Sequence, residues 1–238
     1  MTQNFYSQFG EDRALYNLFN KKIDGVCVEV GGYDGITGSN TYFFEGLGWR
    51  CLIIEPMPDF CKKIISCRRS EVIEVAASDV KGETKFYVAE GVETLSTMKY
   101  DASHFERIFK DGAHGIREIQ VKTDLLDSIF QLKGFTTIDF LTLDVEGNEM
   151  SALRGMSFDS IRPRILIIED SSFGSNSEVY EFMRSKNYSR FKRTGCNDWY
   201  ADRNDDFVTL PLILKVNIEI KTSLFWRQLK SRIKNVFF

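Results

Sequence analysis

The sequence has no Cys-x-x-Cys pair among its five cysteines, which lie at positions 27, 51, 61, 67 and 196. An odd number of cysteines without paired spacing argues against a disulfide framework and a structural zinc site, and it favours a reducing, cytoplasmic location. The first residues lack the basic region and apolar core of a secretory signal, so we expect none. No apolar run is long enough to cross a bilayer.

Extreme charge and internal repetition are also missing. The chain has 238 residues, a net charge of −3 and 43% hydrophobic residues. This balance gives no general attraction to nucleic acid, so no nucleic-acid partner is expected. The length suits one domain with a sizeable core, and no composition break marks a second. We expect one domain over residues 1–220, followed by a distinct tail over residues 221–238. The sequence does not indicate an oligomeric state.

The most informative motif is a Gly-rich turn. An apolar run leads into residues 31–35 (Gly-Gly-Tyr-Asp-Gly), and a second apolar run ends in Glu55 about 20 residues on. This is the layout of a nucleotide site, because glycines let the backbone approach a ligand and the acid can accept two hydrogen bonds from a ribose diol. The dinucleotide fingerprint would need glycines where Tyr33 and Ile36 stand. With Glu29 inside the first strand, the pattern suits S-adenosylmethionine better than NAD.

Further residues in and after the first three predicted strands are candidates for binding this cofactor. Asp34 could hold the amino acid part of S-adenosylmethionine. Ser78 and Asp79 close the third strand, where the aspartate could bind the adenine amino group or simply form an Asx turn. The candidates within or directly after the first two strands are Glu29, Gly31, Gly32, Asp34, Gly35 and Glu55.

Carboxylates also follow the fourth and fifth predicted strands. Asp144 and Glu169 stand at these positions, and ligands of such sheets bind beyond the carboxyl ends of the strands. Clustered carboxylates raise each other's proton affinity, so one could act as general base toward a substrate hydroxyl. We predict catalytic roles for Asp144 and Glu169, and we interpret Glu146 as a helix cap. The same acids are the ligand type that Mg²⁺ prefers, so a bound metal is an open alternative.

Apolar β-branched runs alternate with helical periodicity along most of the chain. Strands are expected at residues 26–30, 50–54, 71–77, 138–143 and 165–168, with two late strands at 188–193 and 207–210. Alternating strands and helices predict a parallel sheet, and the late pair without an intervening helix predicts an antiparallel edge. We therefore expect an α/β fold, a doubly wound Rossmann-like sheet of seven strands. Residues 90–115 look irregular and are predicted to form the acceptor-binding loop.

Seven segments together resemble the FkbM family of S-adenosylmethionine-dependent methyltransferases. They lie at residues 7–12, 28–35, 39–41, 55–56, 76–79, 138–147 and 197–200. The resemblance implies methyl transfer to oxygen, often on a sugar or a glycosylated natural product, and hence a small-molecule or glycan acceptor. It also implies cofactor roles for Gly31, Gly32, Asp34 and Glu55, and it adds Gln8 from the first segment. An NAD-dependent oxidoreductase and a non-catalytic scaffold with the same fold remain the alternatives.

The tail over residues 221–238 falls outside this resemblance. It has five basic residues, no acidic residue and several aromatic and aliphatic ones. A basic amphipathic helix of this kind can lie in the interface of a membrane. The pattern also suits a helix that docks on the domain or on a partner subunit. Peripheral membrane contact through the tail is therefore one of two expectations.

Overall fold

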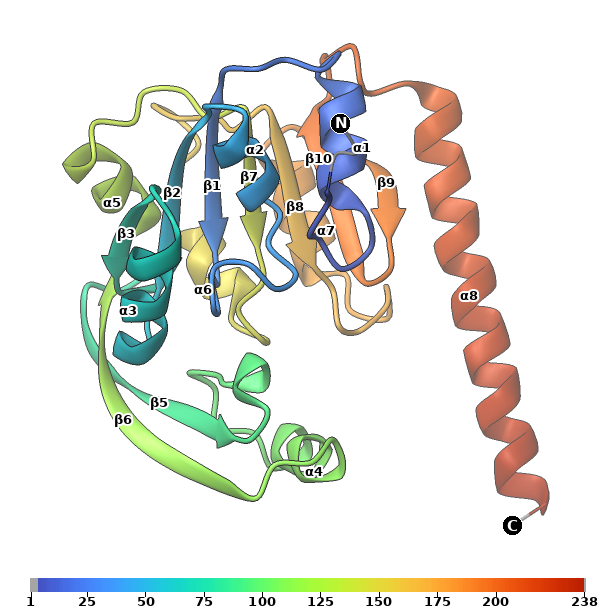
Figure 1. Ribbon diagram of the computed structural model, residues 1–238. Coiled ribbons are helices and arrows are strands. Elements are labelled where there is room, and N and C mark those ends of the chain that lie inside the picture. Colours follow the sequence, from blue (N-terminus) through green and yellow to red (C-terminus); the bar gives the residue numbers. More distant parts are fainter. Residues whose placement is uncertain (1–3, 238) are drawn as a thin grey trace.

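A seven-stranded sheet forms the centre of the molecule in a computed structural model that describes residues 4–237, without the side chains of residues 103, 228 and 231–237. Its order is β3-β2-β1-β7-β8-β10-β9 (Figure 1). The strands are β1 Val26–Val30, β2 Arg50–Glu55, β3 Glu71–Glu74, β7 Phe140–Leu143, β8 Ile165–Glu169, β9 Tyr188–Thr194 and β10 Asn197–Asp202. Strands β3, β2, β1, β7 and β8 are parallel, and β10 is antiparallel to both neighbours. The predicted sheet with its antiparallel edge pair is confirmed.

Helices cover both faces of this sheet, because its central strands are apolar on both sides. On one face, α1 Glu11–Leu18 and α2 Tyr42–Gly46 pack with Phe140 and Trp199. On the other face, α5 Leu126–Leu132, α6 Glu149–Arg154 and α7 Glu178–Ser185 pack with Leu141 and Leu166. The helix α3 Pro58–Cys67 lies beside β2 and β3. These layers fix the carboxyl ends of the parallel strands at one edge of the sheet.

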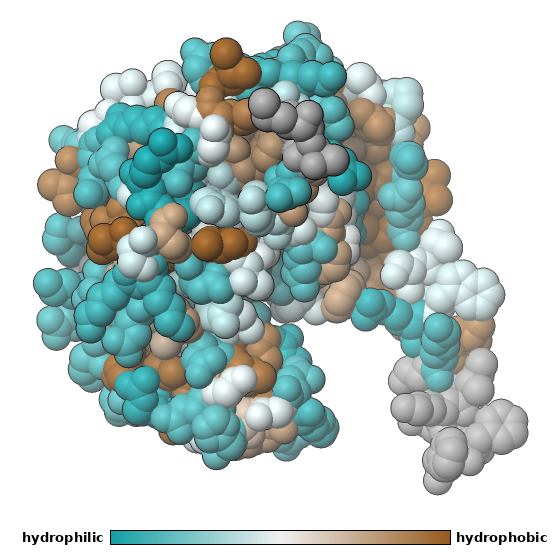
Figure 2. Space-filling view, in the orientation of Figure 1, coloured by the Kyte–Doolittle hydropathy of each residue, from teal (hydrophilic) through white to brown (hydrophobic). Residues whose placement is uncertain are grey.

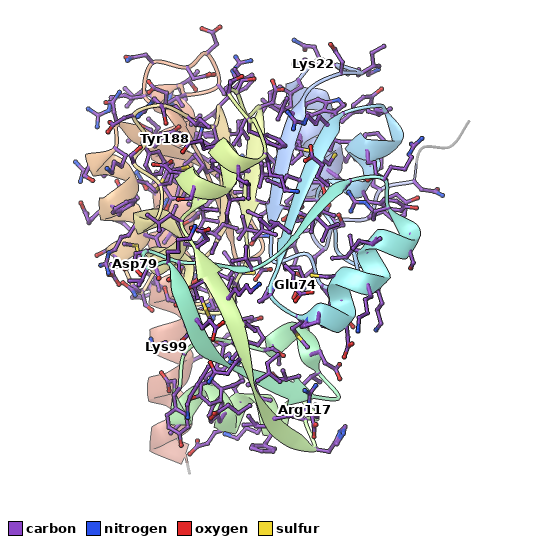
Figure 3. All side chains as sticks on the ribbon, turned by 90° about the vertical axis from the view of Figure 1, so that its left-hand side faces the viewer. Lys22, Glu74, Asp79, Lys99, Arg117 and Tyr188 are labelled. Atoms are coloured by element: carbon purple, nitrogen blue, oxygen red, sulfur yellow. The ribbon has the colours of Figure 1, made fainter. Side chains whose placement is uncertain are left out.

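A smaller sheet forms an arm beyond that edge. It consists of β4 Ala76–Ala77, β5 Gly82–Glu90 and β6 Gly115–Asp124 in the order β4-β6-β5. The 3-10 turn η1 Glu93–Leu95 and the helix α4 Ala102–Lys110 lie at its far end. In the turned view, Lys99 and Arg117 mark that end and Asp79 marks the root of the arm (Figure 3).

Two features of the arm differ from the sequence prediction. The third strand, expected over residues 71–77, divides into β3 of the main sheet and β4 of the arm. Residues 90–115, expected to be irregular, contain α4. The helix has a clear apolar face, but histidine, serine and charged residues dominate its composition and hide the pattern.

The second edge strand lies earlier than predicted. Residues 207–210 form no strand, and β10 lies instead at Asn197–Asp202, which the sequence suggested was a polar loop. The reason is an ion-pair network. Asp198 is 2% exposed and pairs with Arg190 at 2.8 Å and Arg193 at 2.6 Å, so a charged residue is buried inside the sheet.

The chain ends in a long helix, α8 Leu210–Phe237, which runs beside β9 (Figure 1). It passes through the expected boundary at residue 220 without interruption. Phe238, the last residue of the predicted tail, lies outside the described residues. Within the described part of the chain, no helix is long and apolar enough to cross a membrane.

Candidate active site

A cavity of about 580 Å³ lies at the carboxyl ends of β1, β2, β7 and β8. The main sheet contributes Gly31, Glu55 and Asp144 to its wall, and the arm contributes Phe86 and Arg107. Cofactor sites of proteins have volumes of roughly 300–1,000 Å³. The cavity therefore has room for a nucleotide-sized ligand between sheet and arm.

The turn after β1 requires glycine. Gly31 has φ +90°, and its amide donates to the carbonyl of Ile54 at 2.9 Å. A Cβ at this position would lie 1.9 Å from the carbonyl oxygen of Asp144. At Gly32, a Cβ would lie 2.3 Å from the Ile53 side chain. Because glycine has no side chain, the turn can pack closely against the ends of β7 and β2. Its backbone then forms part of the cavity wall.

Glu55 ends β2 and points its carboxylate toward this turn. One oxygen accepts hydrogen bonds from the amides of Gly32 at 3.1 Å and Tyr33 at 3.0 Å, and the other accepts from the amide of Met57 at 2.9 Å. The residue is 5% exposed, and burial raises the pKa of its carboxyl from 4.5 to about 7. With about four lone-pair sites on its two oxygens, the carboxylate has one acceptor site left, on Oε1, for a hydroxyl donor of a ligand.

Three further carboxylates meet at the ends of β7 and β8. Asp144, Glu146 and Glu169 each place an oxygen within 4.8 Å of the others. Burial, followed by the charges of Asp144 and Glu146, raises the pKa of Glu169 to about 10. Asp144 faces the cavity, and protein atoms surround it on the other sides. Burial therefore raises its pKa, while its hydrogen bond with Glu169 opposes that rise. The hydrogen bond between them raises the pKa of Glu169 and lowers that of Asp144, which makes Glu169 the donor and Asp144 the acceptor.

Glu146, the third member of this cluster, contacts the arm through both its side chain and its backbone. It has φ +50°, and its carboxylate pairs with Arg107 of α4 at 2.8 Å. Burial raises its pKa to about 7, and Asp144 adds to the rise. Its carbonyl accepts a hydrogen bond from Thr97 at 2.8 Å. These contacts connect the arm to the carboxylate cluster. They could not be predicted from the sequence, because the partners are far apart in the chain.

The fold and the cavity agree with the comparison with protein families. The model of the methyltransferase FkbM domain matches residues 29–190, which is more than half of the chain. The chain belongs to the FkbM methyltransferase family. It is therefore an S-adenosylmethionine-dependent methyltransferase, as the resemblance implied.

Other comparisons add little to this assignment of the FkbM domain. No curated protein matches the chain. Among solved structures, it is similar to the precorrin-6y C5,15-methyltransferase from Geobacter metallireducens GS-15, with 9% identity, a TM-score of 0.38, and coverage of 79% of this chain and 84% of that one. A likeness this weak says nothing about the reaction.

The FkbM domain brings several of the predicted site residues into one cavity. The lining includes Gln8, Glu29, Gly31, Gly32, Glu55, Asp144 and Glu169. Glu29 is nevertheless engaged by the protein itself. Its carboxylate accepts hydrogen bonds from Ser39 at 2.7 Å, Asn40 at 2.7 Å and Thr41 at 2.6 Å. It therefore holds the loop after β1 in place.

The other predicted residues lie outside the cavity lining of the FkbM domain. Asp34 accepts bonds from the amides of Ile36 and Thr37 within its own turn, at 2.9 and 2.7 Å. Gly35, with φ +84°, packs beside α3. Ser78 and Asp79 bond the Ser151 hydroxyl, and Asp79 lies at the root of the arm (Figure 3).

The raised pKa of Glu55 predicts how stability depends on pH. A carboxyl whose folded pKa is raised from 4.5 to about 7 stabilises the fold below pH 4.5 and loses that contribution as the pH rises through 7. We expect the free energy of unfolding of the ligand-free FkbM domain to fall over this window, by up to about 1.4 kcal/mol per pH unit for this group. Urea denaturation at several pH values measures the slope.

Two variants of the FkbM domain isolate this contribution. Glu55→Gln should remove the part of the slope between about pH 5 and pH 7, since the amide does not titrate. Glu74→Gln is the matched control, because Glu74 ends the adjacent strand but is exposed. An unchanged slope in Glu55→Gln would show that this carboxyl titrates normally.

Proposed function

We propose that the chain transfers the methyl group of S-adenosylmethionine to a hydroxyl of a sugar, a glycan or a glycosylated metabolite. One observation carries the proposal: a single cavity joins Glu55 at the end of β2 to the carboxylates at the ends of β7 and β8. The first end suits a ribose, and the second suits an acceptor hydroxyl. When bound, the cofactor supplies a methyl group on a sulfonium, which an oxygen can attack.

The residues around Glu55 fit the nucleoside part of the cofactor. Its carboxylate would accept a ribose hydroxyl at the free site of Oε1, while the backbone at Gly31 and Gly32 would approach the ligand closely. Met57 and Phe86 line the cavity nearby and are part of one apolar cluster with Phe60. An apolar wall of this kind suits the flat face of an adenine base.

Asp144 is the group that we assign to accept the hydroxyl proton. It would take this proton as the acceptor oxygen attacks the methyl carbon, which makes the oxygen a better nucleophile. Glu169, whose pKa is raised to about 10, would hold Asp144 in place by donating a hydrogen bond to it. Because methyl transfer is an in-line displacement, much of the remaining task is to position the reacting atoms.

The acceptor would lie between the carboxylate cluster and the arm. Leu95 and Met98 line this part of the cavity, and Arg107 is fixed by Glu146. Apolar surface combined with carboxylate and guanidinium groups is the combination that binds the faces and hydroxyls of a sugar ring. This arrangement supports a glycan or glycosylated acceptor.

The carboxylate cluster can balance its charge with protons or with a divalent cation. Asp144, Glu146 and Glu169 offer three oxygens within 4.8 Å of one another, and hard cations such as Mg²⁺ take oxygen ligands of this type. The donor set therefore fits Mg²⁺ as an alternative to the shared proton. Chelation distinguishes the two, because only a cation-balanced site loses activity in EDTA.

We also propose a reducing, cytoplasmic location. All five cysteines are free thiols. Cys27 and Cys51, on neighbouring strands, place their sulfurs 3.0 Å apart in the core as hydrogen-bonded thiols and not as a disulfide. Free thiols held this close are typical of a reducing compartment.

Ligand binding tests the proposed function. S-adenosylhomocysteine should raise the melting temperature, because a ligand that binds only the native state stabilises it, and NAD should not. Glu55→Gln should weaken binding in calorimetry by roughly 1–3 kcal/mol, through loss of charged hydrogen bonds. Incubation with labelled cofactor and a panel of sugars and glycosides should then yield an O-methylated product.

The exposed Glu74 at the neighbouring strand end provides the control for this experiment. Glu74→Gln should bind S-adenosylhomocysteine like the wild type. A thermal shift with NAD and none with S-adenosylhomocysteine would instead favour an oxidoreductase. Cofactor binding without transfer to any hydroxyl would leave the O-methylation proposal unsupported and would favour a scaffold or another acceptor atom.

A further inference from the structure

The helix α8 has one face that is already packed on the domain. Val216 and Ile220 are 2% and 5% exposed, and Ile220 lies against Gly174 in the segment after β8. Further along the helix, the Arg227 guanidinium lies 3.7 Å from the ring centre of Phe173. These contacts fix the rotation of α8 about its axis. The opposite face is therefore turned toward solvent.

The sides of α8 turned away from the domain carry large apolar side chains: Phe225 lies opposite the packed residues, and Trp226 lies about a quarter turn from Arg227. Phe225 and Trp226 are 61% and 55% exposed, and their rings lie 5.7 Å apart in an edge-to-face arrangement. Leu214 and Ile218 are exposed on the same side as Phe225, because residues four and seven positions apart share a helix face. Contiguous exposed apolar side chains of this kind mark an interaction surface.

Basic side chains lie beside these aromatic ones. Lys221 precedes Phe225 by one turn and Lys230 follows Trp226 by one turn, and both lysines are exposed. Residues 221–238 contain five basic and no acidic residues, although the whole chain has a net charge of −3. The C-terminal part of α8 is therefore net positive, whereas the rest of the molecule is net negative.

The C-terminal half of α8 is also free to approach a large surface. It continues past the end of β9, away from the sheet (Figure 1). In the space-filling view, the coloured atoms of this helix at the lower right are separated from the arm by open space (Figure 2). A flat partner can therefore reach this half of the helix without contact with the main sheet.

Such a face could bind a second copy of the chain or a membrane surface, and the charges of α8 favour one of the two. A second copy of the chain would bring Lys221 and Lys230 against the same lysines, and like charges across an interface are unfavourable. The nearest acid on the helix, Glu219, lies 3.9 Å from Lys215. An anionic bilayer offers opposite charge to the lysines and a polar-apolar boundary to the aromatic rings. We infer that the outer face of α8 docks on an anionic membrane surface.

Vesicle sedimentation of the full chain tests this inference and needs neither cofactor nor acceptor. The chain should sediment at low salt with phosphatidylcholine vesicles that contain phosphatidylserine, and it should stay in solution with phosphatidylcholine alone. Lys221→Gln with Lys230→Gln should lower the partition coefficient about 25-fold. Phe225→Ala with Trp226→Ala should lower it about 100-fold, because two large apolar side chains lose their burial.

Substitution is preferable to truncation, since removal of the tail would also remove the contact between Arg227 and Phe173. Matched controls come from exposed residues elsewhere. Lys62→Gln with Lys81→Gln, and Ile65→Ala with Leu132→Ala, should bind vesicles like the wild type. All four double variants should keep the wild-type melting temperature.

Three results would overturn the inference. The full chain could remain in solution with phosphatidylserine vesicles at low salt, or it could bind neutral vesicles equally well. Light scattering could instead show a dimer that Phe225→Ala with Trp226→Ala converts to a monomer, which would assign the face to a second copy. None of these results bears on methyl transfer, so the inference and the proposed function fail separately.

Discussion

Replacing Asp144 with asparagine should lower the rate of methyl transfer by roughly 10²- to 10⁴-fold while leaving the affinity for S-adenosylhomocysteine nearly unchanged. The amide keeps the shape of the side chain but cannot accept the hydroxyl proton. Steady-state kinetics with labelled cofactor give the rate, and calorimetry gives the affinity. A loss confined to turnover identifies a group that acts in the transition state.

The partner carboxyl provides an informative comparison. The pKa of Glu169 is raised to about 10, and its hydrogen bond with Asp144 makes it the donor of the pair. Glu169→Gln retains a donor to Asp144, so we expect it to lower the rate by less than about tenfold. If Glu169→Gln proves far more damaging than Asp144→Asn, the two roles are reversed. If EDTA abolishes transfer and Mg²⁺ restores it, the cluster holds a cation, and both acids are its ligands.

Gly31→Ala should be the most damaging single substitution for stability. The residue has φ +90°, and the new Cβ would lie 1.9 Å from the carbonyl oxygen of Asp144, so backbone must shift. We expect a loss of about 3 kcal/mol or more in the free energy of unfolding, from conformational strain combined with overpacking. Urea denaturation measures the loss, and S-adenosylhomocysteine binding should fall with it.

Gly134→Ala separates the two causes. Gly134 has φ +66° but no atom within 4 Å of its added Cβ. The free energy of unfolding of Gly134→Ala should fall only by the cost of a left-handed backbone at a residue with a side chain, about 1–2 kcal/mol. Equal losses in both variants would mean that the Cβ added at Gly31 is accommodated without overpacking against the end of β7.

Much of the fold was readable from the sequence because its signals are local. Continuous apolar runs such as residues 50–54 predicted buried parallel strands, and the intervening helical periodicity predicted the crossovers. The last strand was missed because Asp198 makes β10 look polar. Its burial depends on Arg190 and Arg193 of the preceding strand. A local pattern cannot show that charges will neutralise each other across a sheet.

Part of the candidate site could also be predicted from local patterns in the sequence. Spacing brought out Glu55 and Asp144, because strand ends of a parallel sheet meet at one edge. Glu29 was expected to face the cofactor, but a buried acid within a strand needs donors. The hydroxyls of Ser39 and Thr41 supply these donors. The two polar residues soon after the Gly-rich turn were the one sign in the sequence that Glu29 has protein partners. Arg107 could not have been found, since it meets the site only through the folding of the arm.

The way the arm joins the body also bears on how such enzymes diversify. Strands β4 and β6 pair at Ala76 with Thr123 and at Ala77 with Asp124, and the amide of Ser78 donates to the carbonyl of Asp124 at 3.0 Å. The chain therefore leaves the central sheet and returns to it at adjacent points. Residues between them can lengthen, shorten or change character without displacing the strand that ends at Glu55. Under the proposed function, acceptor preference and cofactor use can thus evolve on separate parts of one polypeptide.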